Sequence, residues 1–181
     1  MRKPLSLSSI TATGLFALAA WAPPALAGHT NIVLEARLDG REEVRADVST
    51  RALVGDPDGY GEAYVFGIDG DPFTLCYVLT VHKLAELDLP PGAPRMAHIH
   101  EGARGSNGPV VANLAWPQGG QAGDCLTEGE GAGTAGVKFP SGESGIVQRI
   151  LNNPNGFYIN VHNGAYPAGA VRGQLSDTAS H

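Results

Sequence analysis

The sequence has little positive charge and no long hydrophobic run beyond its first residues. Its 181 residues hold 12 lysines and arginines against 18 acidic residues, a formal net charge of −6. Proteins bind nucleic acids and anionic membrane surfaces through clusters of basic residues, and no such cluster is present. A transmembrane helix needs about 20 consecutive apolar residues, which no later stretch supplies. We therefore expect no nucleic-acid partner and no membrane span.

The motifs of several catalytic classes are also missing. No Gly-x-Ser-x-Gly segment is present, and no glycine-rich segment ends in Gly-Lys-Ser/Thr or opens a helix after a strand. No Asp/Glu-rich calcium loop is visible either. The carboxylates of Asp39, Glu42 and Glu43 cluster, but a solvated loop explains them. These absences favour a binding protein over an enzyme and leave catalysis open.

Only two cysteines are present, Cys76 and Cys125. Neither has another cysteine or a histidine at C-x-x-C-like spacing, so a thiolate metal site is the weaker alternative. In an oxidising compartment two cysteines most simply form one disulfide. Such a bond would close a loop of roughly 50 residues and stabilise the fold by about 4 kcal/mol in the chain-entropy model.

Residues 1–27 have the features of a cleavable export signal. A basic start at Arg2 and Lys3 precedes a short apolar run and an Ala-x-Ala cleavage site that ends at Ala27. We expect a mature chain that is periplasmic or secreted. Residues 28–181 have the size of one domain.

Short alternating apolar runs, separated by glycine and proline, predict an all-β sandwich or barrel. One short helix is predicted at 145–152, where apolar residues have helical spacing. Residues 117–133, which include Cys125, are predicted to form a long glycine-rich loop. The predicted strands span 31–38, 60–68, 73–82, 95–102, 109–116, 134–139, 158–162 and 170–175.

The main candidate site is a set of histidines in two of these strands. His98 and His100 are two residues apart, so they share one face of a strand while Ala97 and Ile99 share the other. His162 has the same context in a later strand, with aliphatic residues on the opposite face. If the two strands are neighbours, three imidazoles gather on one sheet face.

Three imidazoles together favour a transition-metal site. Imidazole suits zinc, copper, iron and nickel, and three ligands leave one coordination position open. His82, at the end of a strand, is a candidate fourth ligand, although it could also be an ordinary polar residue at a strand end. Met96, on the face of His98, is a weaker candidate. His29 and His181, near the chain ends, are taken as incidental.

Several segments together resemble the CHRD domain, a module named after chordin and also found alone in exported bacterial proteins. The resemblance covers nearly all of residues 28–181 and implies an immunoglobulin-like or Greek-key β-sandwich in an extracellular setting. One departure is Glu101-Gly102, where the family usually has Gly-Pro. The matching segments are 38–44 (LDGREEV), 97–102 (AHIHEG), 158–162 (YINVH) and 167–175 (PAGAVRGQL).

The His-x-His strand is also similar to that of copper/zinc superoxide dismutase, another β-sandwich. By that similarity His98, His100 and His162 would bind copper, with zinc as the second choice. No Asp/His-rich zinc loop lies between the histidine segments, which argues against a complete dismutase site. Two alternatives stay open: a dismutase-like enzyme, and a metal-free extracellular module that binds a protein or glycan, with the histidines hydrogen-bonded to Tyr158 and Asn160.

Overall fold

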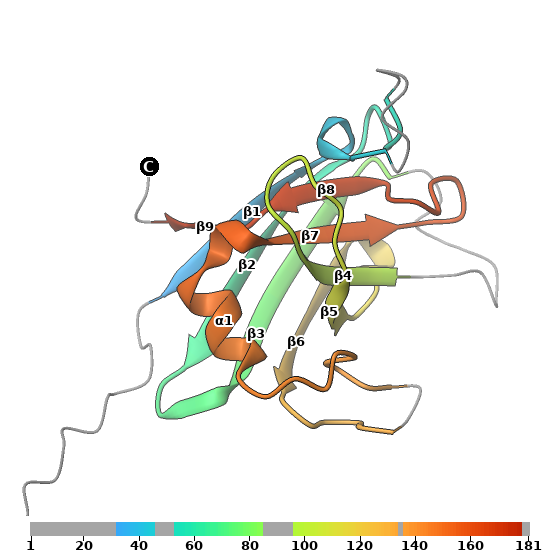
Figure 1. Ribbon diagram of the computed structural model, residues 1–181. Helices are drawn as coiled ribbons and strands as arrows, with labels where there is room; N and C mark the ends of the chain where they lie inside the picture. Colours follow the sequence, from blue (N-terminus) through green and yellow to red (C-terminus); the bar gives the residue numbers. More distant parts are fainter. Residues whose placement is uncertain (1–31, 46–52, 85–95, 134–135, 179–181) are drawn as a thin grey trace, which may run out of the picture.

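Strands are the main secondary structure of the computed structural model, which describes residues 32–45, 53–84, 96–133 and 136–178 (Figure 1). The predicted export signal, 1–27, lies outside these residues. The single α-helix within them is α1 (Ile146–Asn152), and the 3₁₀ turns are η1 (Gly40–Glu42), η2 (Gln118–Gly120) and η3 (Pro154–Gly156). The strands are β1 (Val33–Asp39), β2 (Tyr60–Ile68), β3 (Asp71–His82), β4 (Met96–Glu101), β5 (Val110–Leu114), β6 (Gln121–Thr127), β7 (Phe157–His162), β8 (Val171–Gln174) and β9 (Ser176–Asp177).

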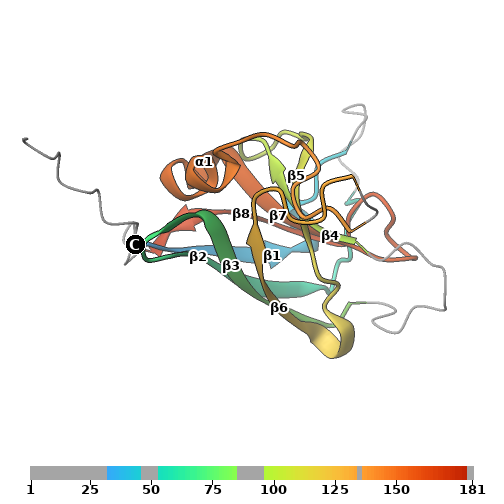
Figure 2. The ribbon, with the colours of Figure 1, turned by 90° about the horizontal axis from the view of Figure 1, so that it is seen from below.

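All these strands belong to one antiparallel sheet. Its order is β5-β4-β7-β8-β1-β2-β3-β6, and the short β9 pairs with β1. The sheet curls so that β5, β4, β7 and β8 form one layer over β1, β2, β3 and β6 (Figure 2). The predicted class, all-β with one short helix, is confirmed in this nearly barrel-like form.

The core lies between the two layers because alternate residues of each strand point inward. The helix α1 packs beside β3 and adds four buried apolar side chains to this core (Figure 1). Burying each large aliphatic side chain contributes about 1.5–3 kcal/mol, so this core is the main source of stability. Inward residues include Leu34, Ala36 and Leu38 of β1, Ala63 and Val65 of β2, Leu79 and Val81 of β3, and Val171 of β8.

The predicted faces of the two histidine strands are confirmed. Ala97 and Ile99 of β4, and Ile159 and Val161 of β7, are at most 1% exposed and belong to the core. The two strands are direct neighbours with antiparallel pairing. The polar residues of both strands therefore share the outer face of the same layer.

Strand β6 contradicts the prediction of a loop over 117–133. It pairs with β3 through its whole length and forms one edge of the sheet. Its sequence, QAGDCLT, is rich in polar and small residues, and only Leu126 is buried. The apolar alternation that marks a strand is missing because only one side chain of β6 is buried in the core. This segment is a strand because it pairs with β3, and a local sequence pattern cannot reveal that pairing.

Two other local predictions differ from the structure. Residues 136–139, within the predicted strand 134–139, form no strand, although the backbone of Lys138 accepts a hydrogen bond from Asn113 N at 2.8 Å. At the other end, Ser176 and Asp177 pair with β1, although they lie beyond the last predicted strand, 170–175. In both cases only a few residues pair with a strand, and segments this short have too few residues to show a hydrophobic pattern.

The predicted disulfide joins Cys76 of β3 to Cys125 of β6. The two residues are directly opposite each other, with a Cα–Cα distance of 4.0 Å and a sequence separation of 49. The bond therefore fixes the register of an edge strand that has little apolar burial of its own.

Replacing both cysteines tests the contribution of this bond. We expect Cys76→Ala/Cys125→Ala to lower the free energy of unfolding by up to about 4 kcal/mol, because the unfolded chain regains the entropy of an open loop. Urea unfolding followed by circular dichroism measures the loss. Reduced wild-type protein is the control and should unfold like the variant. An unchanged urea midpoint in the variant would contradict the expectation.

Candidate metal centre

The register of β4 and β7 brings His98, His100 and His162 together. Asn160 lies opposite His98, so His162, two residues further along β7, is diagonal to it. The ring centroids of His98 lie 5.5 Å from His100 and 5.4 Å from His162, and those of His100 and His162 are 6.2 Å apart. One nitrogen of each ring lies within 4.8 Å of the others. The three imidazoles therefore gather as the alternation predicted.

This outer face is covered, although it points away from the core. The connection between β4 and β5, residues 102–109, lies over it and is called the covering loop below (Figure 1). His100 and His162 are each only 9% exposed, and every residue of β7 is buried. His98 is partly exposed. The cluster is therefore a recessed polar site with one accessible ring.

Burial keeps the three imidazoles neutral. Removal from water, together with the neighbouring His162 and His100, lowers the pKa of His98 to about 4. Burial also lowers the pKa of His100 and of His162, against the opposing effect of a hydrogen bond to a backbone carbonyl in each case. At neutral pH each ring therefore has an unprotonated nitrogen, the form that coordinates metals.

Two backbone carbonyls select which nitrogens are unprotonated. His100 Nδ1 lies 2.9 Å from Gly108 O, and His162 Nδ1 lies 3.1 Å from Pro167 O. A carbonyl oxygen only accepts, so each Nδ1 carries the proton and each Nε2 has a free lone pair. Both Nε2 atoms, and His98 Nδ1, are buried without a hydrogen-bond partner. A transition metal fits these three nitrogen donors, and metal-bound histidines commonly donate their other N–H in this way.

Tyr158 and Gly108 hold the ring of His100. The Tyr158 ring stacks on His100 with 4.8 Å between centroids and 8° between planes. Gly108 N donates to the Tyr158 hydroxyl at 3.2 Å, while Gly108 O accepts from His100. A Cβ at Gly108 would lie 1.6 Å from Glu101 O, so only glycine fits here. One residue of the covering loop thus fixes both rings.

Arg172 of β8 anchors the covering loop. Its side chain is 2% exposed, and its guanidinium lies 3.4 Å from the centroid of the Tyr158 ring. It donates to Ser106 O at 2.6 Å and to Asn107 Oδ1 at 3.0 Å. Burial lowers the pKa of Arg172, which still carries its charge at neutral pH. A buried cation therefore connects β8 to the loop that orients His100.

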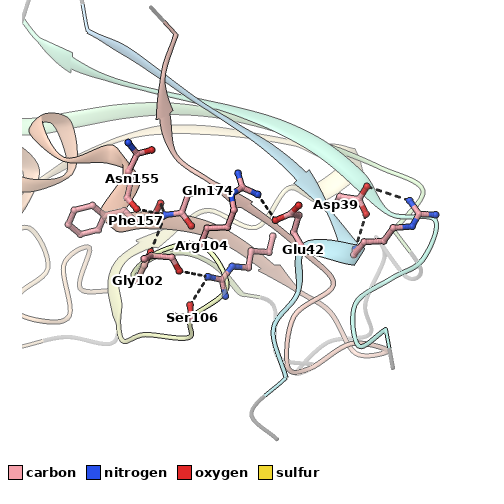
Figure 3. Close-up of polar contacts among 11 residues, drawn as sticks. Asp39, Glu42, Gly102, Arg104, Ser106, Asn155, Phe157 and Gln174 are labelled. Atoms are coloured by element: carbon pink, nitrogen blue, oxygen red, sulfur yellow. Dashed lines mark hydrogen bonds and ion pairs between the residues drawn. The ribbon is translucent and has the colours of Figure 1, made fainter. Parts of the chain in front are cut away.

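Further polar contacts fix the first residues of the loop (Figure 3). Gln174 Nε2 lies 3.0 Å from Gly102 O and 2.7 Å from Phe157 O. Arg104 forms an ion pair with Glu42 of η1 at 2.5 Å. The loop is therefore connected to β7, β8 and the segment that follows β1.

Glu43 also belongs to this site, which corrects its interpretation as a solvated loop residue. Its carboxylate Oε2 accepts from Asn160 Nδ2 at 3.4 Å, and Oε1 is buried without a partner. Burial raises the pKa of Glu43 to about 7, although the charge of Arg172 and the Asn160 hydrogen bond both act to lower it. No local pattern marks Glu43, because its burial comes from strands distant in sequence.

The remaining sequence candidates lie outside the cluster. His82 is exposed at the end of β3, and its ring packs against Tyr60 with 5.0 Å between centroids. Met96 is opposite His162 and 38% exposed, at the rim of the site. His29 and His181 lie outside the described residues. Arg172, absent from the sequence predictions, was detectable in principle as a charged residue in a short strand between apolar neighbours.

The sequence matches the family described as CHRD domain over residues 34–175, which includes every strand of the sheet except β9 and the first residue of β1. No curated protein and no solved structure gives a significant match. Within the described residues, no helix has the length and apolar character needed to cross a membrane.

The hydroxyl of Tyr158 provides a test of the loop contacts. We expect Tyr158→Phe to lower the free energy of unfolding by about 1 kcal/mol, because Gly108 N loses its acceptor in a covered position while the ring stacking is kept. Tyr64→Phe is the matched control, since Tyr64 is 38% exposed on β2 and its hydroxyl is 3.4 Å from Glu62. Urea unfolding compares the variants; equal midpoints for both would contradict the role assigned to Tyr158.

Proposed function

The chain belongs to the CHRD domain family, and we propose that it is an exported protein that binds a transition-metal ion through His98, His100 and His162. The supporting observation is the set of three buried, unpartnered ring nitrogens, one from each histidine. Copper is the proposed ion and zinc the alternative. The proposed role is metal handling or redox chemistry outside the cytoplasm.

The alternative without a metal leaves these nitrogens unsatisfied. Tyr158 stacks on His100 through its ring, and its hydroxyl accepts from Gly108 N; this hydroxyl is not a partner of any of the three buried ring nitrogens. Asn160 directs its amide N–H toward Glu43. A buried polar atom without a partner costs about 1–3 kcal/mol. A bound cation removes this cost at all three nitrogens at once.

The donor set supports copper or zinc over calcium or magnesium. Imidazole nitrogen suits the first two ions, whereas the others take oxygen ligands. The three nitrogens lie within 4.8 Å of one another. Nitrogens that bind one metal ion through bonds of about 2.0–2.1 Å lie closer together than this limit. His98 is the ring able to move, since it is partly exposed and its Nδ1 makes no hydrogen bond. Copper would add access to two oxidation states at the site, which zinc lacks.

A metal titration tests the proposal. We expect wild-type protein to bind one equivalent of Cu(II) or Zn(II), and His98→Ala/His100→Ala/His162→Ala to lose at least about 100-fold in affinity, because all three nitrogen ligands are removed. Isothermal titration calorimetry against a competing chelator gives the constants. Replacing His29 and His181 by alanine in every protein excludes binding by the two terminal histidines.

His82→Ala is the matched control, because it removes a strand histidine that lies outside the cluster. It should keep the wild-type affinity, with the fold of each variant checked by circular dichroism. Wild-type affinity in the triple variant would contradict the assigned ligands. A wild-type protein that binds neither ion, and whose melting temperature neither ion raises, would favour the metal-free extracellular module.

A further inference from the structure

Unpartnered buried atoms are concentrated around the histidine cluster. Among the described residues, six buried side-chain polar atoms have no hydrogen-bond partner, and five belong to the three histidines, Asn160 and Glu43. A metal ion accounts for the three ring nitrogens. Asn160 Oδ1 and Glu43 Oε1 remain, and both are hydrogen-bond acceptors when the carboxyl group is ionised. Buried acceptors of this kind require a donor.

Asn160 lies beside the ligands on the same sheet face. It is directly opposite His98 across the β4–β7 pair and two residues before His162. Residues opposite each other have Cβ atoms about 4.5–5.5 Å apart. The Asn160 amide donates through Nδ2 to Glu43, so its Oδ1 is the end left without a partner. Arg172, on the other side of Asn160, donates to the covering loop.

Glu43 lies over the turn that holds His162. A Cβ at Gly169 would be 2.4 Å from Glu43 Oε2, so the carboxylate packs directly on this turn. Pro167 of the same turn accepts the hydrogen bond from His162 Nδ1. The carboxylate is thus held close to the cluster by β7 on one side and by the β7–β8 turn on the other.

We infer that the bound metal carries a water molecule in its open coordination position and that this water donates to Asn160 Oδ1 and Glu43 Oε1. The inference rests on the proposed metal site. A water bound to a metal through oxygen has two O–H donors, which matches the two remaining acceptors. Three protein nitrogens leave such a position open. The same position accepts small monoanions, such as azide, that displace the water.

Electron–nuclear double resonance on Cu(II)-loaded full-length protein tests the inference. We expect strong exchangeable proton couplings that disappear in D₂O, larger than those of the N–H groups on the imidazole ligands, and an azide-to-copper charge-transfer band when azide displaces the water. In Asn160→Leu/Glu43→Leu, copper affinity should stay within tenfold of wild type, because the ligands remain. The exchangeable couplings should weaken at least twofold, because the water loses both acceptors. Glu62→Gln, on the other layer of the sheet, is the control and should leave the spectrum unchanged.

The outcomes separate this inference from the metal site itself. Copper held by three imidazoles, with exchangeable proton couplings in wild-type protein no stronger than those of the ligand N–H groups, overturns the bound water and leaves the metal site intact. Unaltered couplings in the double variant also overturn the assigned acceptors. If the double variant fails to fold, the single variants Glu43→Gln and Asn160→Leu replace it. Unchanged couplings in both single variants would overturn the assigned acceptors as well. Failure of wild-type protein to bind copper at the histidines contradicts the proposed function instead.

Discussion

The arrangement of the site depends on one buried cation, the guanidinium of Arg172. Burying an arginine costs several kcal/mol unless its donors are satisfied. Here it donates to Ser106 O and Asn107 Oδ1 and lies against the Tyr158 ring, an arrangement worth about 2 kcal/mol when desolvated. These partners belong to the covering loop and to β7. The charge can therefore be buried only when the loop lies over the outer face of the sheet.

The segments that cover this face determine the protonation and the orientation of the histidine rings. Without the loop, His100 would be a solvated residue on an open sheet face. Neither its tautomer nor its ring orientation would then be fixed. The loop removes water, and Gly108 O fixes the proton on Nδ1, so that Nε2 is available inside the site. The β7–β8 turn does the same for His162 through Pro167 O. Tautomer, burial and orientation are consequences of backbone positions, set by contacts between distant segments.

This division explains what the sequence could and could not predict. Alternation placed His98, His100 and His162 on one face, because side-chain direction along a strand is a local property. The edge strand β6 was missed, since its polar residues have no core to match. Glu43 was misassigned as solvated, because its burial comes from Asn160 and Gly169, which lie more than 100 residues away. Local patterns therefore predicted which histidines lie together, while the polar surroundings required the tertiary structure.

The central claim is that the three unpartnered nitrogens are ligands of one metal ion. Anomalous diffraction from crystals of the protein loaded with copper or zinc tests it most directly, because it locates the ion without reference to activity. The account predicts one principal peak, about 2.0–2.1 Å from His98 Nδ1, His100 Nε2 and His162 Nε2. A principal peak at His82, or an ordered water hydrogen-bonded among the three rings with no anomalous signal, would contradict it.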